Sequence, residues 1–462
     1  MTHRSWFGAA CGIASGILLL LSCDMGPFGP LVLIAPAPLL FYALGSVRVW
    51  PVVLWSWVAG LLARGSLIAA YLDVFPTVVL VLWAIALPLW FAAIVVATRW
   101  IARRGTLWAS LLAYPALAAG TEFLFSTVSP HGSFGALGYA ITGFLPVLQI
   151  ASLGGVPALT FVAAFVPMAL VLLIRTPLRW RAVALLAGAP CLAVVIGGAL
   201  RLSEDYDGTA HVALVAIDAL QDDELNSEAQ AGSNVAAYAG IAQELSGNRP
   251  DVILMPEKAL IRKPGWADRG GMLQSVADRS GVPILAGWDE TRPDGSHDNV
   301  AAYYAAGSAP QVYLKRRLIP ELEADFNAGH DSLVIGAQGV AICKDLDFAP
   351  MIRDYGRRGV RLMLVPAWDF RSDTDLHARM ALVRGVENGF AVARAAADGA
   401  LSVSDAFGRA IAAVQTRADR PVTLVAEVGL RSGRTVYNRL GDLFGWLTVG
   451  LMILLIGRRV FR

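Results

Sequence analysis

Three short motifs in the second half of the sequence carry a carboxylate, an amine and a thiol. Glu257 lies in the segment MPEKA, Lys315 in YLKRRLIP and Cys343 in ICKD, and each segment follows a strand candidate. A carboxylate can accept the proton of a thiol, and an ammonium can stabilise the resulting thiolate and then an oxyanion. In this order, the motifs predict a Glu–Lys–Cys site in which Cys343 is the nucleophile.

Each of these residues also has a structural interpretation. A single glutamate after a strand is usually solvated or caps an element, and a single cysteine more often packs in a core. Cys343 is the only cysteine in the polar part, because Cys11, Cys23 and Cys191 lie in apolar segments. Lysine is scarce, with four in the whole chain, which favours a specific requirement at Lys315.

A second alternative pairs Cys343 with His377, as in papain-like enzymes, on sequence order alone. His377 lies in a helix candidate, where capping or lining the helix is the simpler interpretation. We find no His/Cys spacing typical of a metal site and no Gly-rich loop after a strand, so we expect no cofactor. The net charge is +2 and no basic stripe carries aromatic residues, which argues against a nucleic-acid partner.

The elements that must position these motifs alternate between strand and helix candidates over residues 203–435. Such alternation predicts a layered α/β domain. The strand candidates are 211–217, 252–256, 283–288, 299–305, 333–342, 361–366 and 390–396, and the helix candidates are 228–245, 267–279, 347–358 and 374–387.

The rest of the chain is far more apolar than a soluble domain. The whole sequence is 56% hydrophobic and 16% charged, against about 45–50% and about 25% for soluble proteins. The excess lies in residues 1–202 and 436–462. Since a membrane span needs about 20 apolar residues, we expect an α-helical transmembrane bundle of about eight spans, at 6–22, 29–46, 51–72, 76–98, 107–125, 153–174, 181–201 and 441–457.

The distribution of arginine predicts the orientation of this bundle. The loops 23–28, 73–75 and 126–152 hold no Lys or Arg. Basic residues gather at the termini and in the other loops, as Arg4, Arg48, Arg99, Arg103, Arg104, Arg175, Arg179, Arg181, Arg458, Arg459 and Arg462. The positive-inside rule then places both termini in the cytoplasm and residues 203–435 outside it. A lipoprotein signal ending at Cys23 is the alternative reading of the N-terminus, but the charge pattern favours a retained first span.

Two charged residues lie within the predicted spans. Arg64 falls in the third span and Glu122 near the far end of the fifth. Intramembrane charges usually face the bundle interior and are candidates for function. We consider a structural Arg64–Glu122 pair and contact of Arg64 with a lipid headgroup.

Several stretches resemble the nitrilase (carbon–nitrogen hydrolase) superfamily, whose signature is Glu, Lys and Cys in this order. Over nearly its full length, the chain resembles the apolipoprotein N-acyltransferase family of bacterial inner membranes. The resemblance includes FGALGY at 134–139, LQIASLGG at 148–155, VENG at 386–389 and GRTVYNRLGD at 433–442. Glu122 falls where that family places a glutamate ahead of the first of these stretches.

The resemblance implies an αββα sandwich and a role for each site residue. Glu257 would be the base, Lys315 the oxyanion stabiliser and Cys343 the nucleophile. Glu323, eight residues after the lysine, would support the lysine and the substrate. Asp345 would also support the site, and Trp368, Arg64 and Glu122 are candidates for substrate binding.

The sequence departs from the family pattern around the expected pocket. Cys343-Lys344-Asp345 replaces the usual Cys-Tyr-Glu, PAWDF at 366–370 replaces the Asn-Asp…Trp-Phe-Gly stretch, and Lys258 stands where a small polar residue is common. The first strand reads AID at 216–218 in place of Gln-Gly-Asn. These changes leave the acyl-transfer residues intact and leave the acceptor open.

The resemblance implies transfer of a fatty acyl chain from a membrane phospholipid, through a Cys343 thioester, to the N-terminal amine of a diacylated apolipoprotein. It implies a monomer in the bacterial inner membrane with a periplasmic catalytic domain. One alternative is an acyltransferase or amidase acting on a different amine, amide or water. Another is a membrane scaffold with a relict nitrilase domain.

Overall fold

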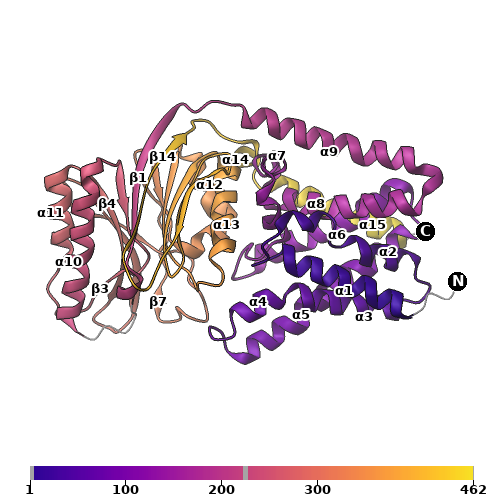
Figure 1. Cartoon of the computed structure of the whole chain (residues 1–462), viewed down its shortest axis with the longest axis horizontal. Coiled ribbons are helices and arrows are strands. Elements are labelled where there is room, and N and C mark those ends of the chain that lie inside the picture. The colour runs from indigo at the N-terminus through magenta and orange to yellow at the C-terminus, as the bar shows by residue number, and fades with distance from the viewer. Residues whose placement is uncertain (1–4, 222–226, 461–462) are drawn as a thin grey trace. The chain divides into compact units, whose positions relative to one another are not determined.

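A computed structural model describes residues 5–221 and 227–460, so Arg4 and Arg462 of the orientation argument lie outside the described residues. The chain divides into two compact units (Figure 1). One unit comprises Met1–Glu204 with Leu440–Arg462, and the other comprises Asp205–Arg439. The sequence-based boundaries at 202/203 and 435/436 remain predictions.

The first unit is a bundle of apolar helices. Within the described residues, six helical stretches are long and apolar enough to cross a membrane. They are α3 (Trp50–Ala63) continuing into α4 (Gly65–Ala70), α5 (Thr77–Ala102), α6 (Leu107–Val128), α8 (Ala151–Arg175), η3 (Pro177–Arg179) continuing into α9 (Trp180–Leu202), and α15 (Leu443–Val460). They confirm six of the predicted spans as apolar helices of membrane-crossing length.

The two remaining expected spans form shorter helices. The first is α1 (Ser5–Ser22), and the second is divided into η1 (Gly29–Leu33) and α2 (Ala37–Gly45). Pro30, Pro36 and Pro38 lie in the divided stretch, and proline cannot donate the backbone hydrogen bond that continues a helix. The number of eight spans therefore stays a prediction.

The connection between α6 and α8 is structured. It contains η2 (Leu137–Gly143) and α7 (Leu145–Leu148). Both α6 and α8 are among the most buried helices of the bundle, whereas α9 is mostly exposed within it. An apolar helix with little burial inside its own unit is typical of one that faces lipid.

The second unit contains two β-sheets. The first has the order β14-β1-β2-β4-β5-β6, with β3 beside β4 and β7 beside β5. Its strands are β1 (Gly208–Ala216), β2 (Val252–Leu254), β3 (Leu260–Arg262), β4 (Ile284–Thr291), β5 (His297–Tyr304), β6 (Gln311–Leu314), β7 (Phe326–Asn327) and β14 (Val422–Leu430). β1, β2 and β4 run parallel, so the carboxyl ends of β2 and its neighbours lie at one edge.

The second sheet has the order β13-β12-β11-β10-β9-β8. Its strands are β8 (Leu333–Ile335), β9 (Gln338–Val340), β10 (Leu362–Trp368), β11 (Ala391–Ala397), β12 (Ala400–Ser404) and β13 (Ala410–Gln415). β9, β10 and β11 are parallel. The expected strand 333–342 is in fact the hairpin β8–β9, which turns at Gly336 with φ 57°, a conformation that glycine adopts without a steric penalty.

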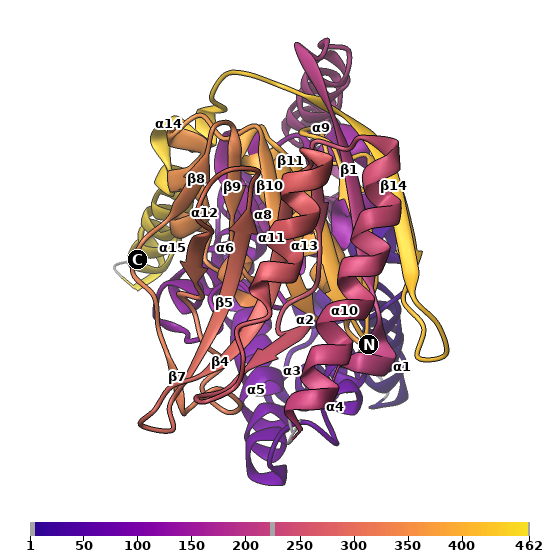
Figure 2. The same ribbon diagram turned by 90° about the vertical axis from the view of Figure 1, so that its left-hand side faces the viewer.

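Four helices cover the outer faces of the two sheets. Figure 1 shows α10 (Glu228–Leu245) and α11 (Gly270–Ser280) on one side and α12 (Ala349–Arg357) and α13 (Thr374–Asn388) on the other. In Figure 2, α10 and α11 lie in front of the first sheet. The arrangement confirms the αββα sandwich expected from the sequence.

Three apolar clusters hold these layers together. The central one joins the facing sides of the sheets, with Leu214 and Leu254 from one and Leu364 from the other. A second packs α10 and α11 on the first sheet, as Tyr238 shows, and a third packs α12 and α13 on the second, as Ile352 shows. Each layer thus buries one apolar face against its neighbour.

Candidate functional site

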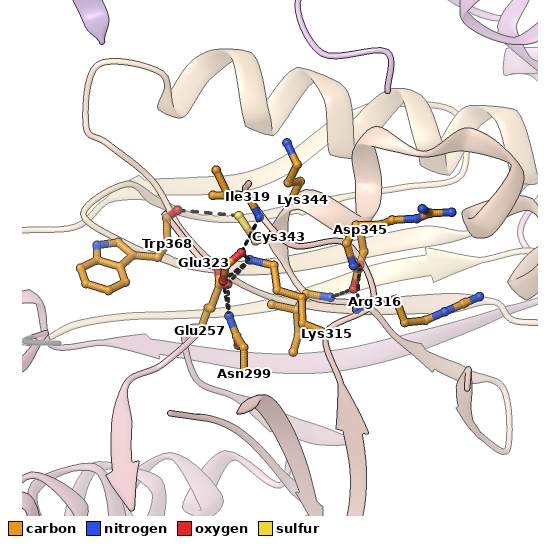
Figure 3. Close-up of polar contacts among 12 residues, drawn as sticks. Glu257, Asn299, Lys315, Arg316, Ile319, Glu323, Cys343, Lys344, Asp345 and Trp368 are labelled. Carbon is orange, nitrogen blue, oxygen red and sulfur yellow. Dashed lines mark hydrogen bonds and ion pairs between the residues drawn. The ribbon is translucent and has the colours of Figure 1, made fainter. Parts of the chain in front are cut away.

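Glu257, Lys315 and Cys343 all follow strands of the sandwich. Glu257 lies in the turn after β2, Lys315 directly follows β6, and Cys343 begins the short helix η6 (Cys343–Asp347) after β9. The backbone N–H of Glu257 donates to the carbonyl of Ala367 on β10 at 3.2 Å, which ties this turn to the second sheet. Figure 3 shows the three side chains converging.

Lys315 is the centre of a buried charge cluster. Its Nζ donates to Glu257 Oε1 at 2.7 Å and to the two carboxylate oxygens of Glu323 at 2.8 and 2.9 Å. All three side chains are almost completely buried. Buried charges are tolerated when they are paired and hydrogen-bonded, so each member of the cluster stabilises the others.

Asn299 belongs to the same cluster, although the sequence analysis did not single it out. Its Nδ2 donates to Glu257 Oε1 at 2.7 Å and to Glu323 Oε1 at 2.9 Å, and its backbone carbonyl accepts from the N–H of Lys315 at 2.8 Å. In the sequence, Asn299 stands out only as a polar residue near the start of an apolar strand candidate. Asn299 therefore fixes the separation of the two carboxylates.

The cluster changes the proton affinities of its members. Burial alone would lower the pKa of Lys315, but Glu257 and Glu323 outweigh it and raise that pKa well above its usual value. Burial would raise the pKa of Glu323, but Lys315 outweighs it and lowers that pKa below its usual value. Lys315 and Glu323 are therefore an ammonium and a carboxylate at neutral pH.

Cys343 is buried and held in an unusual backbone conformation. Its φ is 41°, and its Sγ lies 3.7 Å from the backbone oxygen of Trp368. Burial raises the pKa of the Cys343 thiol well above its usual value; Glu257 adds to the rise and Lys315 opposes it. The resting group is a neutral thiol, so its reaction as a nucleophile requires a base.

Asp345 connects the segment that carries Lys315 with the segment that carries Cys343. Its Oδ2 accepts from the Tyr313 hydroxyl at 2.6 Å and from the N–H of Ile342 at 2.9 Å. Its Oδ1 accepts from the N–H groups of Arg316 and Arg317 at 3.2 and 2.8 Å. Burial raises the pKa of Asp345 to about 6, against the opposing effect of the Tyr313 hydrogen bond.

Left-handed backbone conformations occur within and beside this cluster, and also at Asp24 and Arg249 elsewhere in the described chain. Six non-glycine residues of the described chain have positive φ. Lys258 (48°) follows Glu257, Cys343 is itself one of the six, and Arg371 (55°) and Asp398 (46°) contact each other. Such conformations are costly for side chains with a Cβ and gather at functional sites. They mark this site independently of its charges.

Trp368 lies at the edge of the cluster, at the end of β10. Its carbonyl contacts Cys343, and its Nε1 donates to Asp398 Oδ2 at 3.1 Å. The structure therefore places the backbone of Trp368 next to the candidate nucleophile, and its role in substrate binding remains a prediction.

In the helical unit, Arg64 does not pair with the expected partner Glu122. Arg64 Nη1 donates to the two carboxylate oxygens of Asp24 at 2.7 and 3.0 Å and to the carbonyl of Gly135 at 3.2 Å. Glu122 instead accepts from the N–H of Leu137 at 2.9 Å and from the Thr160 hydroxyl. A direct Arg64–Glu122 pair is therefore wrong, because nearer groups satisfy both side chains.

Arg64 and Glu122 nevertheless line the same interior space. Two cavities of about 80 and about 90 Å³ both include Arg64, Glu122, Leu87 and Trp90 in their walls. One cavity is otherwise mostly apolar, and the other also contains serine side chains and His131. Substrate binding by Arg64 and Glu122 remains a prediction.

Among the described residues, no hydrogen bond connects His377 with Cys343. Its Nε2 lies 3.2 Å from Asp373 Oδ2, and potential metal ligands of Asp369, Asp373 and His377 lie within 4.8 Å of one another. No spacing of these residues in the sequence predicts this grouping. Asp369, however, forms a two-point ion pair with Arg394, which occupies the carboxylate that a cation would need.

Known proteins are similar to this chain in both of its units. A family model described as the apolipoprotein N-acyltransferase N-terminal domain matches residues 15–169. A protein of Geobacter metallireducens named apolipoprotein N-acyltransferase is 26% identical, covering 95% of this chain and 92% of its own. A protein of the same name from Chromobacterium violaceum is also 26% identical, covering 87% of this chain and 79% of its own.

Similar solved structures include Saccharomyces cerevisiae Nit3, a member of the nitrilase superfamily, and an amidase from Nesterenkonia. The first is 19% identical with a TM-score of 0.42, covering 49% of this chain and 92% of that one. The second is 20% identical with a TM-score of 0.39, covering 50% and 92%. The chain is similar in sequence to the apolipoprotein N-acyltransferases, to their N-terminal family model over residues 15–169 and to the two named relatives over most of its length.

Proposed function

We propose that this protein is an N-acyltransferase that moves a fatty acyl chain from a phospholipid, through a thioester on Cys343, to the N-terminal amine of a diacylglyceryl-cysteine apolipoprotein. The observation that carries the proposal is the buried Lys315, held by Glu257 and Glu323 at 2.7 to 2.9 Å beside the Cys343 thiol. The names of its relatives supply the acceptor class, an apolipoprotein, and the transfer of an acyl group to nitrogen; the phospholipid donor is what the family resemblance implies.

In the first half-reaction, Glu257 accepts the Cys343 proton as the sulfur attacks the ester carbonyl of the phospholipid. The carbonyl π electrons become an oxyanion, which the Lys315 ammonium stabilises. The intermediate then collapses: the C–O bond to glycerol breaks, Glu257 returns the proton to the departing alkoxide, and lysophospholipid leaves. A thioester remains on Cys343.

In the second half-reaction, the free amine of the acceptor attacks the thioester carbonyl. Lys315 again stabilises the oxyanion, the C–S bond breaks, and an amide forms. The amine proton passes through Glu257 to the departing Cys343 sulfur, which restores the thiol. A base is needed in both steps because burial keeps the pKa of the free thiol high.

The remaining members of the cluster position these groups. Asn299 donates hydrogen bonds to Glu257 and Glu323, and Glu323 accepts one from Lys315. We infer that they hold the ammonium and the base at a fixed separation. A covalent intermediate also suits two bulky lipid substrates, because the donor can leave before the acceptor binds.

The second candidate is the same chemistry with a different acceptor, including water. It is favoured by one observation: Lys344 and Asp345 directly follow the nucleophile, and both side chains are buried there. A changed environment at this position would alter the acceptor while leaving thioester formation intact.

The deciding experiment is the intact mass of the full-length protein after incubation with phospholipid. We expect one added fatty acyl mass that hydroxylamine removes. Cys343→Ala should abolish the adduct, whereas a variant with Cys11, Cys23 and Cys191 changed to Ala should retain it.

A diacylated lipopeptide with a free amine should then discharge the adduct and become triacylated. The same peptide with a blocked amine should leave the adduct in place. Discharge by water alone would favour a hydrolase. No adduct with any lipid, in a folded preparation, would favour a scaffold.

A further inference from the structure

Two opposite charges of the helical unit face the same interior space without pairing. Arg64 and Glu122 line both of the cavities of about 80 and about 90 Å³. Leu87 and Trp90 belong to both walls as well, so the two cavities adjoin. Charged side chains within an apolar bundle usually face its interior and are candidates for function. Together the cavities offer a ligand a cation and a carboxylate on separate walls.

Arg64 keeps one donor edge that the described residues do not use. Its printed partners, Asp24 and the carbonyl of Gly135, all accept from Nη1, and no described residue accepts from its Nε or Nη2. This edge of a guanidinium matches two oxygens of a phosphate. The Asp24 side chain is only 1% exposed and is in neither wall. A ligand would therefore meet the cation and not the carboxylate that pairs with it.

Glu122 accepts hydrogen bonds from neutral groups. They are the N–H of Leu137 at 2.9 Å and the hydroxyl of Thr160. Among the described side chains, no cation forms an ion pair with Glu122. A carboxylate without a cationic partner is costly in an apolar bundle, and a cation bound in the cavity would offset that cost.

Aromatic side chains share the wall of the second cavity with Glu122. They are Trp83, Trp90, Phe125 and Phe134. The indole N–H of Trp90 donates to the hydroxyl of Thr121 at 3.1 Å, which fixes this ring. An aromatic face attracts a cation through its quadrupole, and groups of such faces recognise alkylammonium ions. The rings and the carboxylate thus favour the same kind of ligand group.

The wall of this cavity reaches the outer surface of the helical unit. Phe125 is 48% exposed. Helix α5, which carries Trp83 and Trp90, also exposes Leu82, Ile85 and Leu89. An apolar helix with exposed leucine and isoleucine is typical of one that faces lipid, so a molecule that enters here comes from the bilayer.

We propose that the helical unit binds the headgroup of a zwitterionic phospholipid in this space. The headgroup ammonium lies against Glu122 and the aromatic wall, and the phosphate accepts from the unused edge of Arg64. Each charge of the headgroup then meets an opposite charge, whereas an anionic headgroup would bring a phosphate near Glu122 without a cation. The inference does not depend on the chemistry at Cys343.

The test measures lipid binding by native mass spectrometry of the full-length protein in a non-ionic detergent. A Cys343→Ala background and short-chain ether lipids prevent acyl transfer. We expect a phosphocholine lipid to bind about tenfold more tightly than the phosphoglycerol lipid with the same chains. Equal affinity for the two lipids would overturn the proposal.

Glu122→Gln removes the charge and keeps the size of the side chain. Its amide can still accept from the Leu137 N–H and donate to the Thr160 hydroxyl, so we expect the fold to be retained. The phosphocholine lipid should bind about tenfold more weakly. An unchanged affinity in this variant would also overturn the proposal.

An alkyltrimethylammonium, which carries the cation without a phosphate, separates the two contacts. Arg64→Lys keeps a cation for Asp24 but lacks the second donor edge. It should weaken binding of the phosphocholine lipid and leave the alkyltrimethylammonium unchanged, whereas Glu122→Gln should weaken both. An equal loss of both ligands in Arg64→Lys would refute the phosphate contact.

Asp73→Asn is the control for removal of a negative charge. Asp73 is exposed in the same unit and belongs to neither wall, so this variant should bind all ligands as the Cys343→Ala parent does. A loss equal to that of Glu122→Gln would show an effect of total charge and overturn the proposal. Competition by free phosphocholine as strong as by the lipid would assign the site to a soluble ligand and refute the lipid as its occupant.

Discussion

At the scale of single residues, the buried charges of the candidate site stabilise one another through ion pairs and hydrogen bonds. Lys315 donates to both Glu257 and Glu323, and Asn299 donates to the same two carboxylates. Removing one member leaves a buried charge without its partner, which is costly. The cluster is therefore rigid in its resting state, and small changes of donor geometry should affect it strongly.

We expect Lys315→Arg to slow acyl-adduct formation by about 10²–10³-fold, the usual effect of losing one oxyanion donor. The charge is kept, but a planar guanidinium cannot place its donors as a compact ammonium does. The measurement is the single-turnover rate by intact mass. Lys263→Arg, at a half-buried lysine whose ammonium lies over the ring of Trp266, should behave as wild type. Wild-type rates in Lys315→Arg would exclude Lys315 as the oxyanion group.

Asp345 should give the activity an acidic limb near pH 6. Burial raises its pKa to about 6, and protonation there removes acceptor capacity from a carboxylate that binds the N–H groups of Arg316 and Arg317. The loop after Lys315 should then loosen as pH falls. We expect the rate of adduct formation to decline below about pH 6 and Asp345→Asn to lose this dependence. A limb that survives in Asp345→Asn belongs to another group.

The same shift predicts the opposite trend in stability. The pKa of Asp345 is higher in the folded protein, at about 6, than in an unfolded chain, at about 3.9. The group therefore binds more protons when folded, and its stabilising contribution is full below about pH 3.9 and lost as pH rises through about 6. The wild-type melting temperature relative to that of Asp345→Asn should accordingly fall between these pH values; a rise would contradict the assignment.

At the scale of elements, Gly287 on β4 places the turn that carries the candidate base. A Cβ at Gly287 would lie 2.1 Å from the carbonyl oxygen of Pro256 and 2.8 Å from the Cα of Glu257. Neither backbone atom can move without moving the carboxylate. We expect Gly287→Ala to slow adduct formation at least tenfold, since small misplacements of reacting groups are costly.

Gly271→Ala is the matched control for Gly287→Ala. Gly271 lies in α11, and a Cβ there would meet no atom within 4 Å. Alanine also has the higher helix propensity, so this variant should fold and react as wild type. Wild-type activity in Gly287→Ala would show that the turn after β2 can shift without consequence.

Arg64 connects the junction of α3 and α4 with Asp24, which follows α1. It lies between α3 and α4 and binds Asp24, whose φ of 49° suits asparagine as a replacement. Breaking a buried ion pair costs up to about 3–5 kcal/mol, and Arg64 is partly exposed, so we expect a smaller loss. In detergent, Arg64→Gln and Asp24→Asn should each lower the melting temperature, and the double variant should lose less than their sum. Strict additivity would rule out the pair.

At the scale of the whole molecule, the distribution of basic residues predicts the orientation in the membrane. We expect residues 203–435 to lie outside the cytoplasm, because loop arginines gather at the termini and in alternate loops. A phosphatase fused after residue 300 should be active in the periplasm, and a fusion within loop 99–106 should be inactive. Activity only in the loop 99–106 fusion would reverse the topology.

The sequence by itself determined where the apolar helices lie and that the polar part is an α/β domain, because side-chain periodicity and span length are local properties. It located all seven strand candidates and the four covering helices of the sandwich, and it identified Glu257, Lys315 and Cys343 as the residues to examine. It missed β3, β6, β7, β12, β13 and β14, and it took the hairpin β8–β9 for one strand. The residues of β13 (AIAAVQ) are mostly apolar but exposed or half-buried, so this strand lacks the alternation of apolar and polar residues that marks a half-buried strand.

Only the tertiary structure decided which side chains meet. Asn299 is ordinary in sequence, yet the pairing of β5 with β6 places it against two carboxylates. Arg64 has Asp24 as its partner, 40 residues away, in place of the expected Glu122. Contacts between distant segments depend on strand order and helix packing, and no local pattern specifies them.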